Sequence, residues 1–190
     1  MSGFASEYKS LLVTALDTMP LDRVEQAIEW LTQARDAGRT IFVCGNGGSA
    51  ASASHFVCDM VKGASYQRPN RFKILTLGEN RHTLTAYSND VGYDSVFVEE
   101  LKNFAAPGDV LMAISGSGNS PNVLRAVEYA NAAGLKTIGF SGRDGGQLGP
   151  LAQLDINVAE RHMGRIEDGH MVALHMICYY FMDREGPGAC

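Results

Sequence analysis

The sequence predicts an α/β fold in which short parallel strands alternate with helices. Five apolar runs have the length of buried strands, and they lie at 41–44, 73–77, 110–114, 137–140 and 154–158. Longer segments with apolar residues at helical spacing separate most of these runs. Three runs continue into glycine-rich turns, at 45–49, 115–120 and 141–146. A strand followed by a glycine turn and a helix is typical of parallel α/β sheets.

The composition fits a globular protein of ordinary domain size. The chain has 190 residues, of which 45% are hydrophobic and 19% are charged. The net charge of -5 argues against a general nucleic-acid binder, because no basic excess is available to displace counterions. No apolar run approaches the roughly 20 residues of a membrane helix, and the N-terminus lacks the hydrophobic core of a signal peptide. We therefore expect a cytoplasmic protein that binds neither nucleic acid nor a membrane.

The cysteines do not form a metal-binding or disulfide pattern. Cys44, Cys58, Cys178 and Cys190 lie far apart and contain no CxxC pair. We expect neither a structural disulfide nor a thiolate zinc site.

Two amphipathic helices are predicted before the first strand. Residues 4–18 and 21–37 have apolar residues at helical spacing, Pro20 separates them, and Gly38 ends the second. Two such helices cannot bury both of their faces on one small sheet. A subunit interface is one use for the surplus apolar surface, and a simple covering pair of helices is the alternative.

The turn at 45–49 has the features of an anion site at a helix start. Its glycines let the backbone approach a ligand closely, and the first N–H groups of the next helix have no partner within the helix. His55 and Asp59 follow at a spacing of four residues, so both side chains leave the same helix face. An imidazole and a carboxylate at this spacing can bind a metal or transfer protons. An ordinary hydrogen-bonded pair would have the same spacing.

The middle of the chain is less informative. Residues 79–90 show little periodicity and include Asp90. A helix is predicted over 96–104, and a turn at 107–109 leads into the third strand.

The turn at 115–120 carries the strongest indication of a phosphate site. Pro121 follows it at the first turn of a helix that runs to Gly134. Ser115, Ser117 and Ser120 place hydroxyl groups beside the free N–H groups of this helix start, which suits a phosphate. The turn matches neither GxxxxGK[ST] nor GxGxxG, so a nucleoside triphosphate or dinucleotide is not supported. Two such turns after parallel-type strands favour a phosphate site.

The last predicted helix, 164–183, combines an apolar stripe with acidic and imidazole groups. A rotation of about 100° per residue puts Asp168 within about 20° of His175, whereas Glu167 is about 80° away. Periodicity alone therefore favours Asp168 as the partner of His175. A histidine in an apolar helix is more often a core residue than a ligand, but the acidic and imidazole groups on this helix and at 55–59 favour a functional role.

Four motifs, in this order, resemble the SIS (sugar isomerase) domain family. They are GNGGSAASASHF at 45–56, ISGSGNSPNVL at 114–124, SGRDGG at 141–146 and RIEDGHMVALH at 165–175. Within this family the chain is similar to the sedoheptulose 7-phosphate isomerases, also called phosphoheptose isomerases. The similarity covers nearly the whole chain.

The resemblance implies a fold, an assembly and an activity. The implied fold is a three-layer sandwich of the flavodoxin-like SIS type, with a five-stranded parallel sheet between helices and a preceding helix pair. Residues 1–190 would form one SIS domain, and the helices within 1–38 would serve in oligomerisation. The implied assembly is a homotetramer with active sites at subunit interfaces. The implied reaction converts D-sedoheptulose 7-phosphate to D-glycero-D-manno-heptose 7-phosphate through a zinc-assisted enediol.

The resemblance also assigns roles to residues of this chain. The implied substrate-binding residues are Asn46, Gly47, Ser49, Asp90, Ser115, Gly116, Ser117, Ser120 and Glu167. One zinc ion per subunit would be held by His55, Asp59, Glu167 and His175, with Asp59 also acting as the base and His175 as the acid. Asp59 and Glu167 depart from the family pattern, which has Glu and Gln at these positions. Gly164 stands where an Asp commonly contacts the sugar, and Lys62 and Gly63 replace an arginine that often follows the first helix.

Two alternatives remain open. The chain could isomerise a different sugar phosphate, or it could be a non-enzymatic SIS protein that acts by binding another protein. The joint presence of His55, Asp59, Glu167 and His175 favours the enzyme, because a binding scaffold has no need of four such groups.

Overall fold

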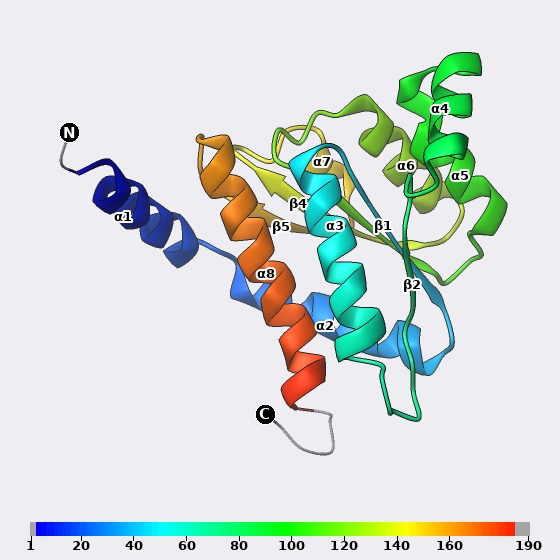
Figure 1. The fold of residues 1–190 in the computed structure, drawn as a ribbon, viewed down its shortest axis with the longest axis horizontal. Helices are drawn as coiled ribbons and strands as arrows, with labels where there is room; N and C mark the ends of the chain where they lie inside the picture. The colour runs from blue at the N-terminus through cyan, green and yellow to red at the C-terminus, as the bar shows by residue number, and fades with distance from the viewer. Residues whose placement is uncertain (1–2, 185–190) are drawn as a thin grey trace.

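The centre of the molecule is a five-stranded parallel sheet with the order β2-β1-β3-β4-β5 (Figure 1). The computed structural model describes residues 3–184. The strands are β1 (Thr40–Gly45), β2 (Lys73–Thr76), β3 (Val110–Ser115), β4 (Lys136–Gly142) and β5 (Leu154–Val158). All four neighbouring pairs are parallel, and Ile41 lies opposite both Ile74 and Val110. The predicted α/β fold with a parallel sheet is confirmed.

Helices connect and cover the strands. They are α1 (Phe4–Asp17), α2 (Leu21–Asp36), α3 (Gly48–Cys58), α4 (Arg81–Asp90), α5 (Val96–Phe104), α6 (Pro121–Ala132), α7 (Leu148–Leu151) and α8 (Met163–Asp183). A π-helical turn, Asp59–Gly63, extends α3, and a 3-10 turn, Tyr93–Ser95, precedes α5. Among the described residues, no helix is both long enough and apolar enough to cross a membrane.

The sequence missed α4, for a physical reason. None of its residues is buried, so it has no apolar stripe at helical spacing. Its start is instead fixed locally, because the Asn80 side chain accepts hydrogen bonds from the backbone N–H groups of His82 and Thr83. The predicted helices elsewhere agree with the structure to within two residues at each end.

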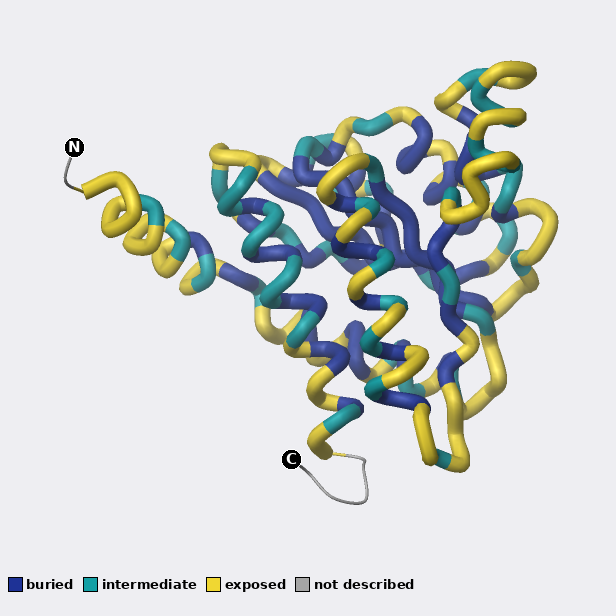
Figure 2. Tube along the Cα trace, in the orientation of Figure 1, coloured by how far each residue is buried: buried dark blue, intermediate teal, exposed yellow. Residues whose placement is uncertain are grey.

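The sheet divides the core into two layers because successive side chains of a strand point to opposite faces. On β1, Ile41 and Val43 pack with residues of α2, α3 and α8. Phe42 and Cys44 pack with residues of α5, α6 and α7 on the other face. Both faces are therefore covered, and the strands form the buried centre of Figure 2. Cys44, Cys58 and Cys178 are free thiols, and Cys190 lies outside the described residues.

Helix α1 extends away from this three-layer body (Figures 1 and 2). Ala15 is its one buried residue, whereas Phe4 is 76% exposed and Val13 is 48% exposed. It is joined to the start of α8 by a hydrogen bond from the Tyr8 hydroxyl to Asp168 Oδ2, at 2.7 Å. A single chain thus leaves most of the apolar surface of α1 uncovered, and the use of residues 1–38 in oligomerisation stays a prediction.

The topology determines where the glycine turns meet. After β1 the chain moves outward to β2 and then crosses to β3 on the other side of β1. The connections from β1 and β3 therefore diverge above the carboxyl edge of the sheet, the position where parallel α/β folds bind ligands. The turns at 45–49 and 115–120 both lie at this edge.

Candidate functional site

Three serine hydroxyls converge between β3 and α6. Ser115 Oγ lies 3.1 Å from Ser120 Oγ and 3.4 Å from Ser117 Oγ. Ser120 is the N-cap residue of α6, yet its side chain makes no capping hydrogen bond to the helix backbone. Its hydroxyl therefore stays available to a ligand at a helix start, where the helix dipole favours an anion. This arrangement, which we call the serine turn (residues 115–120), fits the predicted phosphate site.

The serine turn is held by the glycine turn that follows β4. Gly118 has a φ of 66°, and a Cβ atom there would lie 2.2 Å from the carbonyl oxygen of Gly145. The backbone N–H of Leu148 donates to the Gly118 carbonyl at 2.9 Å. The two turns are thus interlocked, and only glycine fits at position 118.

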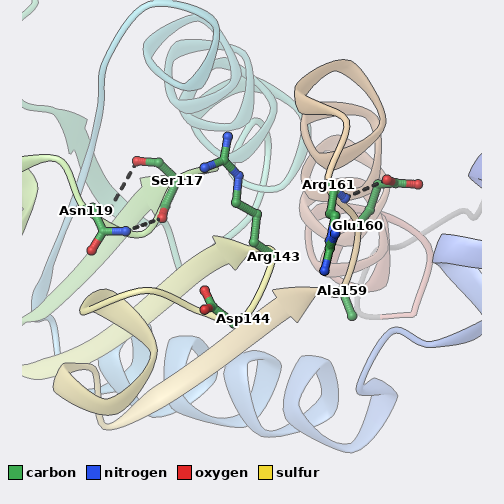
Figure 3. A pocket seen from close by; sticks show the side chains of 7 residues that line it. All are labelled: Ser117, Asn119, Arg143, Asp144, Ala159, Glu160 and Arg161. Carbon is green, nitrogen blue, oxygen red and sulfur yellow. Dashed lines mark hydrogen bonds between the residues drawn. The ribbon is translucent and has the colours of Figure 1, made fainter.

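A cavity of about 600 Å³ adjoins the serine turn (Figure 3). It is lined by Ser117, Asn119, Arg143, Asp144, Ala159, Glu160 and Arg161. Glu160 is paired with Arg165 at 2.8 Å, and this hydrogen bond lowers the pKa of Glu160 to about 2. Because Arg165 balances the charge of Glu160, the remaining charged side chains of the lining are Arg143, Arg161 and Asp144. They leave one positive charge in excess.

The turn at 45–49 places Glu167 at the same edge of the sheet. A Cβ atom on Gly48, the first residue of α3, would lie 2.6 Å from Glu167 Oε1. Gly47 is exposed and has a φ of 53°, while Ser49 is buried. The start of α8 therefore presents the Glu167 carboxylate at the start of α3.

Asn46 joins the two turns through side-chain amides. Asn46 Nδ2 donates to Asn122 Oδ1 and Asn122 Nδ2 donates to Asn46 Oδ1, each at 2.9 Å. The Tyr93 hydroxyl also donates to Asn46 Oδ1, at 2.8 Å. Sequence reasoning identified Asn46 but missed both partners. The position of Asn122, a polar residue directly after the proline at the start of an apolar helix, could have indicated a structural role, whereas nothing in the sequence pointed to Tyr93.

A second group of polar side chains lies farther along α3 and α8. His55 Nε2 lies 3.3 Å from Asp59 Oδ2 and 3.3 Å from His175 Nε2, and His175 Nε2 lies 3.9 Å from Asp59 Oδ2. These are the side chains of the described residues whose ligand atoms all lie within 4.8 Å of one another. They remain open to solvent, with side-chain exposures of 51% for His55, 41% for His175 and 26% for Asp59. We refer to them as the His/Asp/His cluster.

The geometry of the cluster fits a zinc ion. Zinc binds imidazole nitrogen and carboxylate oxygen at about 2.0–2.2 Å in a tetrahedron, whose ligand atoms are then about 3.3 Å apart. Two of the three separations have this value, and the third is longer. Two imidazole nitrogens that face each other are also a typical donor pair for a divalent transition metal.

The surroundings of Asp59 are specialised. Asp59 stands where α3 changes into the π-helical turn, a distortion that is frequent at functional sites. The Cys178 thiol donates a hydrogen bond to Asp59 Oδ2 at 3.7 Å. Burial raises the pKa of Cys178 to about 12, so this residue is a neutral thiol at neutral pH and serves as a donor. No pattern in the sequence indicates this contact.

The four residues predicted to bind zinc do not come together within one chain. Glu167 and His175 are eight positions apart, which corresponds to about 12 Å along the axis of α8. Helices α3 and α8 run side by side, so Gly48 meets Glu167 at one end and His55 meets His175 farther down (Figure 1). Glu167 therefore lies at the turns, and three of the four predicted ligands form the cluster.

Asp168 and Asp90 occupy different surroundings from those of the cluster. Periodicity favoured Asp168 as the partner of His175, but its carboxylate accepts the hydrogen bond of Tyr8 from α1. This expectation is wrong because helix rotation specifies a face of α8, whereas the neighbouring helices determine what each residue contacts. Asp90 lies at the exposed end of α4, where it accepts a hydrogen bond from Asn89 at 2.7 Å.

His170 has a structural environment. It is 1% exposed, and its Nε2 lies 2.8 Å from the Ser141 carbonyl oxygen, which can only accept. Burial lowers the pKa of His170 to about 4, so the ring is neutral at neutral pH and donates this hydrogen bond from α8 to the end of β4.

Comparisons with known proteins identify the family and the fold to which the chain is similar. Residues 4–142 match the family model of the SIS domain. The phosphoheptose isomerase of Citrifermentans bemidjiense is 40% identical over 167 residues, which cover 88% of this chain and 86% of that protein. The structure of the phosphoheptose isomerase of Neisseria gonorrhoeae has a TM-score of 0.86 at 31% identity, covering 93% of this chain and 96% of that one. The phosphoheptose isomerase of Francisella tularensis has a TM-score of 0.87 at 26% identity, covering 93% and 95%.

Proposed function

The chain belongs to the SIS domain family, and from this premise we propose that it is a phosphoheptose isomerase. It interconverts an aldose and a ketose phosphate, with D-sedoheptulose 7-phosphate as substrate and D-glycero-D-manno-heptose 7-phosphate as product. The observation that carries the proposal is the presence of the serine turn and the His/Asp/His cluster on one scaffold. The first suits a phosphate, and the second suits proton transfer at a polarised carbonyl group.

The phosphate end of the substrate binds at the carboxyl edge of the sheet. The hydroxyls of the serine turn and the N–H groups at the start of α6 contact the phosphate oxygens, and the backbone at Gly116 lies within this turn. Asn46, Gly47, Ser49 and Glu167 contact the substrate from the neighbouring turn. Asp90 stays a proposed substrate contact without a supporting interaction.

Proton transfer is assigned to Asp59 and His175. The reaction removes a proton from the carbon next to the carbonyl and returns it to the neighbouring carbon, so the two carbons exchange oxidation states without an external oxidant. Asp59 takes and returns this proton. Its Oδ2 is engaged by His55 and Cys178, and within residues 3–184 its Oδ1 has no hydrogen bond, so Oδ1 is free for the transfer. His175 transfers protons to and from the substrate oxygens.

His55, Asp59 and His175 would hold the zinc ion, one per subunit. When bound, the ion stabilises negative charge on the substrate oxygen during enediol formation. Glu167 is proposed as a further ligand that a second copy of the chain supplies, because within one chain it lies about 12 Å along α8 from His175.

We further propose that active sites form between subunits of a homotetramer. The cluster is half exposed and about 10 Å along α3 from the first turn, so one chain does not enclose both ends of a substrate. Exposed apolar residues on α1 and on α8, such as Val13 and Tyr179, provide surface for contacts between copies. The serine turn of one copy would then face the His/Asp/His cluster of another.

A direct assay tests the function. Purified protein incubated with sedoheptulose 7-phosphate should yield the aldose phosphate, as followed by NMR, and chelator treatment should abolish turnover until zinc is restored. Absence of turnover with zinc present would refute the proposal. A panel of ketose and aldose phosphates in the same assay would then identify a different sugar phosphate, and no turnover with any of them would favour the protein-binding alternative.

A further inference from the structure

The buried Asn122 fixes the hydrogen-bonding direction of Asn46. Asn122 is 1% exposed, at the second position of α6, and its Oδ1 accepts from the backbone N–H of Val123 at 3.0 Å. A backbone N–H can only donate, so the atom that it meets must be the amide oxygen of Asn122. The contact with Val123 therefore distinguishes the oxygen of the Asn122 amide from its nitrogen, although the two ends of an amide are nearly equal in size.

The same logic passes from Asn122 to Asn46. Since the Asn122 nitrogen points toward Asn46, it needs an acceptor there, and Asn46 Oδ1 supplies it at 2.9 Å. The Tyr93 hydroxyl donates to the same oxygen at 2.8 Å. An amide oxygen has two lone pairs, so the acceptor capacity of Asn46 is used up by these two donors.

The donor side of Asn46 is only half used. One N–H of its Nδ2 is bonded to Asn122 Oδ1 at 2.9 Å. An amide nitrogen carries two hydrogens, so one donor is left without a partner in the part of the chain that the structure describes, and Asn46 is only partly buried. Asn46 can therefore offer a ligand a hydrogen-bond donor and no acceptor.

We propose that Asn122, assisted by Tyr93, is a positioning residue that makes Asn46 a donor for an acceptor oxygen of the substrate. Such an oxygen belongs to a phosphate or to a carbonyl, and both occur in an open-chain sugar phosphate. The inference rests on the proposed function only for the identity of the substrate. It also gives the amide pair a second effect, because the pair joins the turn after β1 to the helix that starts at the serine turn.

The variant Asn122→Asp tests the direction of the amide pair with almost no change of shape. One carboxylate oxygen can still accept from Val123, but the other would face Asn46 Oδ1 and cannot donate to it. Whichever way the Asn46 amide turns, two oxygens then meet, so its orientation is no longer fixed. We expect the dissociation constant and KM for sedoheptulose 7-phosphate to rise about tenfold or more, with kcat changing much less.

Asn131→Asp is the matched control. Asn131 lies on the same helix, donates from Nδ2 to the Leu151 carbonyl at 2.9 Å, and accepts from Thr137 and Gln153 through Oδ1. The exchange therefore removes a comparable donor in a comparable network, away from the turns. We expect it to lower thermal stability and to leave KM unchanged.

Tyr93→Phe is a milder second variant, because Tyr93 is 51% exposed and its loss should not affect folding. It frees one lone pair of Asn46, and we expect substrate affinity to fall by about twofold to fivefold. If Asn122→Asp does not fold, the substrate affinity of Tyr93→Phe still tests whether the partners of Asn46 orient its amide.

Calorimetry separates failure of this inference from failure of the proposed function. If the wild type does not isomerise sedoheptulose 7-phosphate, the proposed function fails, and binding of the same compound still reports on Asn46. A folded Asn122→Asp protein with wild-type affinity, or a Tyr93→Phe protein with wild-type affinity, would overturn the inference. So would an equal rise of KM in Asn131→Asp.

Discussion

The serine turn and the His/Asp/His cluster differ in how completely one chain builds them. At the serine turn, the Ser115 hydroxyl lies within 3.4 Å of those of Ser117 and Ser120, Ser115 is buried, and neighbouring backbone interlocks with the turn. In the cluster, His55 and His175 are about half exposed, and the predicted fourth ligand lies about a dozen ångströms away along α8. This difference is the basis of our proposal that phosphate binding is a local property of a turn, whereas the catalytic end is completed by assembly.

The largest expected effect is at the cluster. Replacing Asp59 with Asn removes the proposed base, and general base catalysis by such a group contributes about a hundredfold to ten-thousandfold to the rate. We expect kcat to fall by about this factor. The rate at which the substrate C1 or C2 hydrogen exchanges with solvent deuterium should fall in parallel.

Zinc content must be measured for the same variant, because Asp59 is also a candidate ligand. Asp36→Asn, a change of the same kind on the surface of α2, serves as the control and should keep full activity. If Asp59→Asn retains zinc and exchanges the hydrogen at the wild-type rate, Asp59 is not the base, and Glu167 or Asp168 becomes the leading candidate.

The next largest effect is expected at the serine turn. The double variant Ser117→Ala and Ser120→Ala loses two hydroxyl contacts to a charged phosphate, so KM should rise about a hundredfold with a smaller change in kcat. Ser88→Ala on α4, whose hydroxyl bonds only the Leu84 carbonyl among the described residues, should leave KM unchanged. A wild-type KM in the double variant would contradict the assignment of the phosphate site.

Assembly should respond to charge on α1. Leu11 and Val13 are 40% and 48% exposed, and replacing both with Lys should shift the protein from a tetramer to smaller species in light scattering. Turnover should fall with the tetramer fraction. Ser10→Lys introduces one lysine at an exposed polar position of α1 and should have a smaller effect than either Leu11→Lys or Val13→Lys alone. A wild-type protein that is monomeric at micromolar concentration would contradict the account.

The smallest effect concerns stability near His170, away from both sites. Folding lowers the pKa of this residue from its ordinary 6.5 to about 4, so between these pH values the unfolded chain binds more protons than the folded one. Stability should therefore fall as the pH decreases from 6.5 toward 4, by at most roughly 3 kcal/mol from this group. His170→Gln should be less stable at pH 7. Its free energy of unfolding, measured by denaturant titration at several pH values, should depend less steeply on pH than that of the wild type. An identical pH dependence of the unfolding free energy in both proteins would show that another group is responsible.

The sequence predicted the features that depend on local chemistry. Strand runs, helix periodicity and the glycine turns located all five strands and the serine turn, because these depend on residues close together in the chain. The spacing of His55 and Asp59 correctly predicted that these two of the three cluster residues lie on one helix face, where their side chains meet.

Features that depend on packing between distant elements were not predictable in the same way. Asp168 turned out to meet Tyr8 of α1, and Cys178 to meet Asp59, across more than a hundred residues of sequence. Tyr93 and Asn122 meet Asn46 only because the sheet brings the connections after β1 and β3 together. The position of Glu167 likewise follows from the parallel packing of α3 and α8.

The most direct test of the central claim is a mixing experiment with two impaired proteins, assayed at a substrate concentration well below the KM of the serine variant. One carries Ser117→Ala and Ser120→Ala, so its cluster is intact, and the other carries Asp59→Asn and His175→Gln, so its serine turn is intact. If active sites combine the serine turn of one copy with the cluster of another, subunit exchange should create some complete sites, and the isomerase activity of the mixture should rise above that of the separate variants. Activity that stays at the level of the separate variants, despite demonstrated subunit exchange, would contradict the claim and place both ends of the active site within one chain.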